Sequence, residues 1–193
     1  MPSISYRLWR TVRKRALDEM ADAHAAVGGT ARGRRYATQQ INRAYAVLLA
    51  SHFQGFCRDL HSECVDHLLL VIAPPAALKS LIREDMLRGR QLDRRNAQPS
   101  SLGADFGRFE IDLWKDLSLF ATGSIAWKND LNLLNDWRNA IVHEDFTSSR
   151  LGGIMYLQLN TVRGWRRSCS RLARAMDEMI RLHMQRLTGV TSW

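Results

Sequence analysis

The longest uninterrupted helical pattern in the sequence runs from about residue 36 to residue 72, and it constrains the fold more than any other feature. Apolar side chains recur along it at intervals of three and four residues: Ile41, Tyr45, Leu48, Leu49, Phe53, Phe56, Leu60, Cys64 and Leu68. This spacing places them on one face of an α-helix. Gly55 is the only glycine in the segment and indicates a close helix contact, and Pro74-Pro75 ends it.

Shorter helical patterns lie on both sides of this segment. Helices are predicted over about residues 3–27, with Ser3 or Ser5 as N-cap, over 76–90 with Pro75 in the first turn, over 106–120, from a cap at Ser124 onward, and over 160–187. Residues 30–35 and 91–103 are predicted as loops and 147–153 as a turn-rich break, and only 154–159 could be extended.

The fold class that follows is all-α: a helical bundle of about five to seven helices. We expect residues 1–193 to form a single domain. Within it, residues 1–35 would supply an N-terminal helix and a basic link, and residues 36–187 the bundle core.

Arginine supplies most of the positive charge. The formal net charge is +9 with a sequence pI of about 10.2, and only four of the 28 basic residues are lysines. The guanidinium fork fits phosphate in a bidentate way, whereas the lysine ammonium is a point charge. This excess indicates a nucleic acid or another polyanion as partner. The alternative origin is a GC-rich genome whose codons favour arginine.

Several protein classes find no support in the sequence. No apolar run approaches the roughly 18 residues needed to span a bilayer, and no apolar stretch follows the basic N-terminus as in a secretory signal. We therefore expect a cytoplasmic protein with no membrane partner. P-loop, GxGxxG and GxSxG motifs are missing. Cys57, Cys64 and Cys169 lack CxxC spacing, and the histidines of the long helix lack the four-residue spacing of a zinc site, so no metal and no cofactor are expected.

One short segment, Asn135-Asp136-Trp137-Arg138-Asn139-Ala140-Ile141-Val142-His143-Glu144, combines residue types that carry chemistry. From the composition, chance predicts roughly 0.03 occurrences of Arg-Asn-x-x-x-His, and the sequence has one. On a helix, Asn139 and His143 lie on one face a turn apart, and the long side chain of Arg138 can swing toward them. Trp137, Ile141 and Val142 are predicted to face the core.

The motif and the long helix together resemble the HEPN superfamily. Arg-Asn-x-x-x-His on a late helix of a small bundle is similar to the Rx4-6H motif of HEPN domains, and Ala44–Phe53 resembles the family's pattern before an aromatic-rich stretch. Many members carry a glutamate near Phe53, where this sequence has Gln54. The resemblance covers roughly residues 36–185, and it points to the stand-alone HEPN proteins of bacterial defence and toxin systems.

The resemblance implies a metal-independent endoribonuclease that works as a homodimer, with the two motifs facing each other across the interface. RNA can be cleaved by its own 2′-hydroxyl, so the protein must move protons and stabilise charge on the phosphate. A histidine with a pKa of about 6.5 can transfer the proton, and an arginine fork can bind the phosphate. We assign these roles to His143 and Arg138, with Asn139 positioning either group. Asp136 or Glu144 could orient the imidazole.

Other interpretations stay open. The motif could be a solvated helix face in which Arg138 pairs with an acid, or the chain could be a non-catalytic HEPN module that docks a protein or nucleic acid. A plain DNA-binding protein is disfavoured because no helix-turn-helix signature is present. The partners we expect are RNA, a second copy of the chain and an antitoxin or sensor protein.

A second set of arginines lies in the last predicted helix. Arg163, Arg167, Arg171 and Arg174 follow three- and four-residue spacing and form a basic stripe that could hold phosphates. We predict that this stripe binds nucleic acid, and the alternative is a solvated face. The basic loop at residues 32–35 could also touch an RNA backbone.

Overall fold

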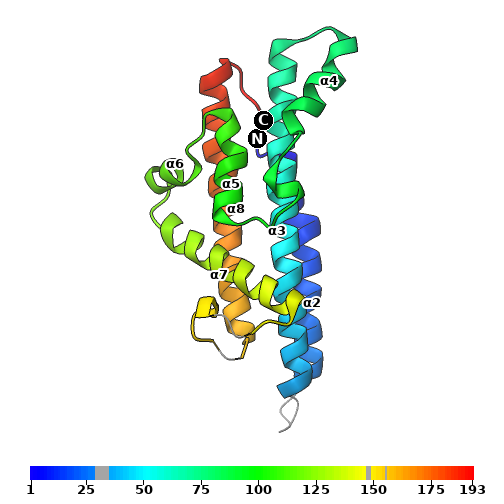
Figure 1. The fold of residues 1–193 in the computed structure, drawn as a ribbon, viewed down its shortest axis with the longest axis vertical. Helices are drawn as coiled ribbons and strands as arrows, with labels where there is room; N and C mark the ends of the chain where they lie inside the picture. Colours follow the sequence, from blue (N-terminus) through cyan, green and yellow to red (C-terminus); the bar gives the residue numbers. More distant parts are fainter. Residues whose placement is uncertain (29–34, 147–148, 155) are drawn as a thin grey trace.

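The computed structural model describes residues 1–28, 35–146, 149–154 and 156–193, and every regular element in these ranges is helical. Figure 1 shows an elongated bundle with the long helix α3 running along it. The predicted all-α helical bundle is therefore confirmed.

Helix α3 (Arg35–Ile72) spans the segment that the apolar periodicity selects. The side chains on its inner face are fully buried: Tyr45, Leu49, Phe53, Phe56, Leu60 and Cys64. The helix ends where Ala73 adopts a positive φ of 47° before Pro74. Pro75 is the N-cap of α4 (Ala76–Leu87), one residue before the first turn in which we expected it, and α4 ends before the predicted residue 90.

The N-terminal helix covers the predicted range but contains a π-helical turn. It consists of α1 (Ile4–Leu8), the π segment η1 (Trp9–Arg13) and α2 (Lys14–Gly28), and Ser3 is its N-cap. A π turn holds more residues than an α turn, so it rotates the helix face that follows it relative to a regular α-helix. Trp9 and Leu17 face the core, whereas Ile4 and Val12 are exposed.

Gly55 allows the N-terminal helix to pack closely on α3. A Cβ atom built on Gly55 would lie 2.5 Å from Nη1 of Arg13. The Arg13 guanidinium passes over this glycine and forms an ion pair with Asp59 at 2.5 Å. The close contact predicted from Gly55 is thus made with a side chain of the N-terminal helix.

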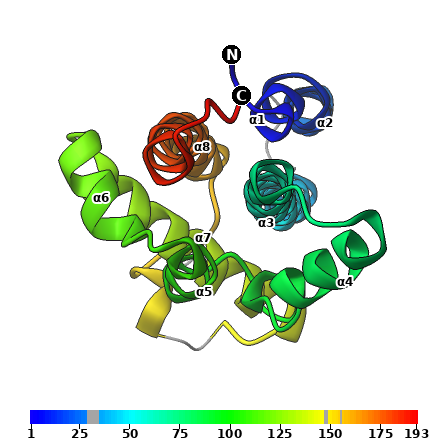
Figure 2. The same ribbon diagram turned by 90° about the horizontal axis from the view of Figure 1, so that it is seen from above.

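Helix α8 (Leu159–Thr188) provides a third long wall of the core. Its inner face buries Val162, Trp165, Cys169, Leu172, Met176 and Ile180. Viewed from above, α3 and α8 lie at the centre of the molecule, with the N-terminal helices on one side of them and α5 (Pro99–Phe106) and α7 (Ser124–His143) on the other (Figure 2). The chain termini lie close together in both views.

The segment from residue 91 to residue 123 differs most from the prediction. The predicted loop 91–103 contains the 3₁₀ turn η2 (Gln91–Asp93) and the start of α5, because Pro99 takes the first helical position, where a missing N–H costs nothing. The predicted helix 106–120 is divided into η3 (Gly107–Phe109) and α6 (Leu113–Phe120). Glu110 separates them because its φ of 61° is left-handed and cannot continue a helix.

Helix α7 crosses the bundle obliquely (Figure 1) and has Gly123, not Ser124, as its N-cap. After it come the 3₁₀ turn η4 (Ser149–Leu151) and two glycines with positive φ, Gly152 and Gly153. The run 154–159 forms no strand in the part that the structure describes. The link at residues 30–34, with its basic loop, and residues 147–148 of the predicted break lie outside the described residues.

None of the described helices combines the length and apolar character needed to cross a membrane.

Candidate functional site

The three motif residues lie in the last two turns of α7. The helix ends because Glu144 adopts a left-handed φ of 54°, and the N–H of Asp145 donates to the carbonyl oxygen of Ala140 at 3.0 Å. This closure satisfies a carbonyl of the final turn. His143 is therefore the last helical residue, and its imidazole stands at the free end of α7.

The motif side chains differ in exposure. Arg138 and Asn139 are half-buried, and His143 is exposed. Neither Arg138 nor His143 forms an ion pair with any residue of the described ranges. A fork without a carboxylate keeps its charge available to a phosphate, which is the property that the proposed chemistry needs.

The apolar face predicted next to the motif is only partly correct. Trp137 is buried and Ile141 is half-buried, but Val142 is 49% exposed. The segment that covers this side of α7 contacts it at Asn135 and Asn139, one to two turns before Val142. The helix therefore extends beyond its cover, and its last turn is open to solvent.

Asn139 connects the motif to the segment around Asn96, part of the predicted loop 91–103. The Nδ2 atom of Asn96 donates to Oδ1 of Asn139 at 2.6 Å, and Nη1 of Arg138 donates to the same oxygen at 3.3 Å. The Asn139 amide oxygen thus accepts hydrogen bonds from both Asn96 and Arg138. Among the described residues, no hydrogen bond joins Asn139 to His143. Sequence reasoning missed Asn96, because nothing in the local pattern indicates a contact with a helix 43 residues away.

Gln54 holds this neighbouring segment in place. Its Nε2 atom donates to the carbonyl oxygens of Leu92 and Arg95 at 2.8 and 2.9 Å. A glutamate at this position could only accept hydrogen bonds, so it would meet two carbonyl oxygens with no donor between them. The Gln54 amide thus ties α3 to the segment that contacts Asn139.

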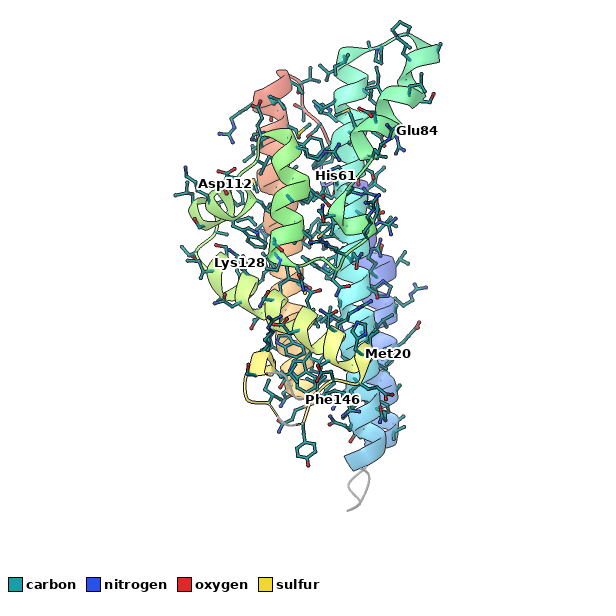
Figure 3. The ribbon with its side chains drawn as sticks, in the orientation of Figure 1. Met20, His61, Glu84, Asp112, Lys128 and Phe146 are labelled. Atoms are coloured by element: carbon teal, nitrogen blue, oxygen red, sulfur yellow. The ribbon has the colours of Figure 1, made fainter. Side chains whose placement is uncertain are left out.

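Arg43 of α3 is a further cation near the end of α7 that the sequence analysis did not select. Its guanidinium carbon lies 4.3 Å from the centroid of the Phe146 ring, and Phe146 packs on Trp137 with centroids 6.2 Å apart. Figure 3 places Phe146 in the half of the bundle away from α4. Since Phe146 follows His143 by three residues, the stacked guanidinium adds positive charge on this side of the motif.

The acidic neighbours of the motif do not orient the imidazole in this structure. Asp136 accepts a hydrogen bond from Nδ2 of Asn132 at 3.2 Å, and burial raises the pKa of its carboxyl group. Glu144 is exposed and forms no described ion pair or hydrogen bond with His143. Within the described ranges, no group of three or more His, Cys, Asp or Glu residues could hold a metal ion.

The four arginines of the basic stripe, Arg163, Arg167, Arg171 and Arg174, are all exposed on α8. The Arg171 guanidinium lies 6.0 Å from the ring centroid of Trp127. No described hydrogen bond or ion pair connects the stripe to the motif of α7. The structure thus joins Arg138, Asn139 and Asn96 by hydrogen bonds, places His143 one turn further along the same helix, and leaves the stripe as a separate surface.

Comparison with known protein families matches the chain to the RiboL-PSP-HEPN family. The family model covers residues 13–181, which include most of the N-terminal helix, the motif, and the part of α8 that carries the basic stripe. Neither the curated proteins nor the solved structures contain a significant match.

Proposed function

Because the chain belongs to the RiboL-PSP-HEPN family, we propose that it is an endoribonuclease whose site is formed by Arg138, Asn139 and His143. The observation that supports this most is the arrangement at the open end of α7. There an exposed imidazole lies within two turns of an arginine that has no carboxylate partner among the described residues and is positioned by an amide.

The proposed reaction uses the RNA's own 2′-hydroxyl as nucleophile. A bond forms between the 2′-oxygen and phosphorus, the bond to the 5′-oxygen breaks, and the products are a 2′,3′-cyclic phosphate and a 5′-hydroxyl. A base must remove the 2′ proton, and an acid must donate a proton to the leaving 5′-oxygen. His143 serves in this proton transfer, and Arg138 stabilises the charge that develops on the non-bridging oxygens.

A homodimer fits this chemistry better than a monomer. One imidazole cannot be protonated and unprotonated at the same time, whereas two copies can act as acid and base in one step. The open last turn of α7 and the uncovered Val142 beside it support a second copy facing this end, with His143 of the partner subunit completing the pair. In the cell, the enzyme would be a toxin or defence effector restrained by an antitoxin or sensor protein.

The first test is cleavage of total RNA in EDTA by the wild type, Arg138→Ala and His143→Ala. We expect fragments with 2′,3′-cyclic phosphate ends from the wild type only, because both variants lack a group that acts in the transition state. Arg88→Ala, at an exposed arginine on the far side of the fold, is the matched control and should cut normally. Equal cutting by wild type and His143→Ala would contradict the proposed site.

Intact RNA in every lane would point instead to the non-catalytic alternative. In that case folded, dimeric wild-type protein would still bind RNA or a partner protein, and His143→Ala would bind equally well. Gel-shift and size-exclusion measurements on the same samples separate this outcome from a misfolded preparation.

A further inference from the structure

A groove between the N-terminal helix and α8 concentrates positive charge away from the α7 motif. It has a volume of about 490 Å³, and its lining includes Tyr6, Trp9, Arg10, Lys14, Arg167 and Arg171. No carboxylate belongs to the lining that the structure describes. A groove with cations and aromatic rings but no acids differs from an ordinary solvated helix face, where charges of both signs alternate.

The two walls of the groove are firmly built. The π turn of the N-terminal helix carries Trp9 and Arg10 on one wall, and π turns are frequent at functional sites. Arg166 connects α8 to α2 and α3. Its guanidinium donates to Oδ1 of Asp18 at 2.6 Å and to Oη of Tyr45 at 3.0 Å. The opposite side chains are thus held at a defined separation before any ligand arrives.

The groove cations fall into two groups. Lys14 and Arg166 are both paired with Asp18, which they keep ionised by lowering its pKa. Arg10 and Arg167 are exposed and have no ion pair among the described residues, and Arg171 has only a ring contact with Trp127. The second group therefore has guanidinium forks free to bind an anion.

We propose that this groove binds the phosphate backbone of single-stranded RNA, with Arg10, Arg167 and Arg171 as phosphate contacts. Tyr6, half-buried with the Arg10 guanidinium 5.9 Å from its ring centroid, supplies a planar surface for a base. The proposal rests on the proposed function in that RNA is the substrate, and it adds a binding site outside the α7 motif.

Two features favour RNA over an acidic protein. Arg163 and Arg174 continue the line of Arg167 and Arg171 along α8, and at a rise of about 1.5 Å per residue the four span roughly 16 Å. A row of arginines of this length can contact successive phosphates of one RNA strand that runs along α8. Aromatic rings beside the row suit stacked bases, and arginine forks bind phosphate in a bidentate way.

The test is RNA binding by full-length protein carrying His143→Ala, which removes cleavage from the measurement. Fluorescence anisotropy with a labelled RNA of about 12 nucleotides, a length within the range of single-strand sites, compares two charge-reversed proteins. One adds Arg10→Glu and Arg171→Glu in the groove. The other adds Arg88→Glu and Arg186→Glu, which change the charge equally at exposed positions outside it.

We expect the groove variant to bind RNA at least about tenfold more weakly than the control and to show a salt slope smaller by about 1.4, the value for two lost phosphate contacts on a single strand. Circular dichroism and thermal melting should be equal for the two. Equal RNA affinity would overturn the proposal, as would poly-glutamate binding the groove as tightly as RNA does. Groove-dependent binding by a wild type that cuts nothing would contradict only the nuclease assignment.

Discussion

Two regions of the molecule each combine a histidine with an arginine. In one region both side chains are buried, and in the other they are open to solvent or only half-buried. In the first, His61 is fully buried against the rings of Phe106 and Phe109, with centroids 5.7 and 4.8 Å away. Arg90 is 6% exposed and donates to both carboxylate oxygens of Asp93 at 3.1 and 2.8 Å. Figure 3 labels His61 well away from Phe146, near which the second pair lies.

In the second region, at the end of α7, His143 is exposed and Arg138 has no described ion pair. The difference lies in what surrounds the same two residue types. Burial, followed by the charges of Arg90 and Arg108, lowers the pKa of His61 to about 4, so this ring stays neutral at physiological pH. A histidine locked in one protonation state cannot exchange protons with a substrate, whereas a solvent-exposed one can.

The largest difference should appear in cleavage rate. His143→Gln is expected to lower single-turnover RNA cleavage by about a thousandfold, because it removes a proton-transfer group. His61→Phe, which extends the aromatic cluster, should leave the rate near that of the wild type. A folded His61→Phe protein with no activity would mean that the buried histidine also acts in the reaction.

The pH dependence of stability should report on the buried His61. The unfolded chain takes up a proton on His61 below about pH 6.5, whereas the folded chain does so only near pH 4. The free energy of unfolding should therefore fall by about 3 kcal/mol from this group as the pH falls from 6.5 to 4. Urea titrations across this range should show a shallower dependence for His61→Phe than for the wild type. Burial also lowers the pKa of His24, His52 and His67, and their contribution remains in the variant.

Arg90 and Arg138 should differ in how much each contributes to the stability of the fold. Arg90→Met removes one of the two arginines that pair with Asp93, together with the hydrogen bonds that Arg90 donates to the Arg58 carbonyl and the Ser62 hydroxyl, at a cost of about 2 kcal/mol. Arg138→Met should change the urea midpoint little and reduce cleavage instead. If the two substitutions destabilised the fold equally, Arg138 would belong with the structural arginines.

The smallest effect on cleavage rate is expected from Asn96, which hydrogen-bonds to Asn139 of the motif. Asn96→Ala removes the 2.6 Å hydrogen bond to Asn139 and should slow cleavage by about tenfold without unfolding the protein. Asn129→Ala, at an exposed asparagine earlier on α7, is the matched control. A rate unchanged by Asn96→Ala would show that Asn139 is positioned without its neighbour.

Much of the fold can be predicted, because a helix with one buried face shows regularly spaced apolar residues in its own sequence. The apolar spacing of α3 and α8 and the break at Pro74 follow from rules that act over a few residues. The motif on α7 was visible for the same reason. The left-handed Glu110 was not predictable, because no turn residue marks it.

Contacts between segments far apart in the chain are not indicated by any local sequence pattern. The bond from Asn96 to Asn139 and the stacking of Arg43 on Phe146 depend on how α3, α7 and the intervening chain pack together. The spacing of apolar residues identifies which of them share a helix face, but it does not indicate which segment packs on that face. Val142 was placed in the core for this reason and lies in solvent.

The glycine at position 55 has an evolutionary consequence. A Cβ atom there would meet only the end of the Arg13 side chain, which is flexible and can move aside. A relative with alanine at position 55 should therefore hold the Arg13 guanidinium elsewhere, with a weakened ion pair to Asp59. Because partly exposed ion pairs contribute little to stability, we expect this exchange to be tolerated at small cost.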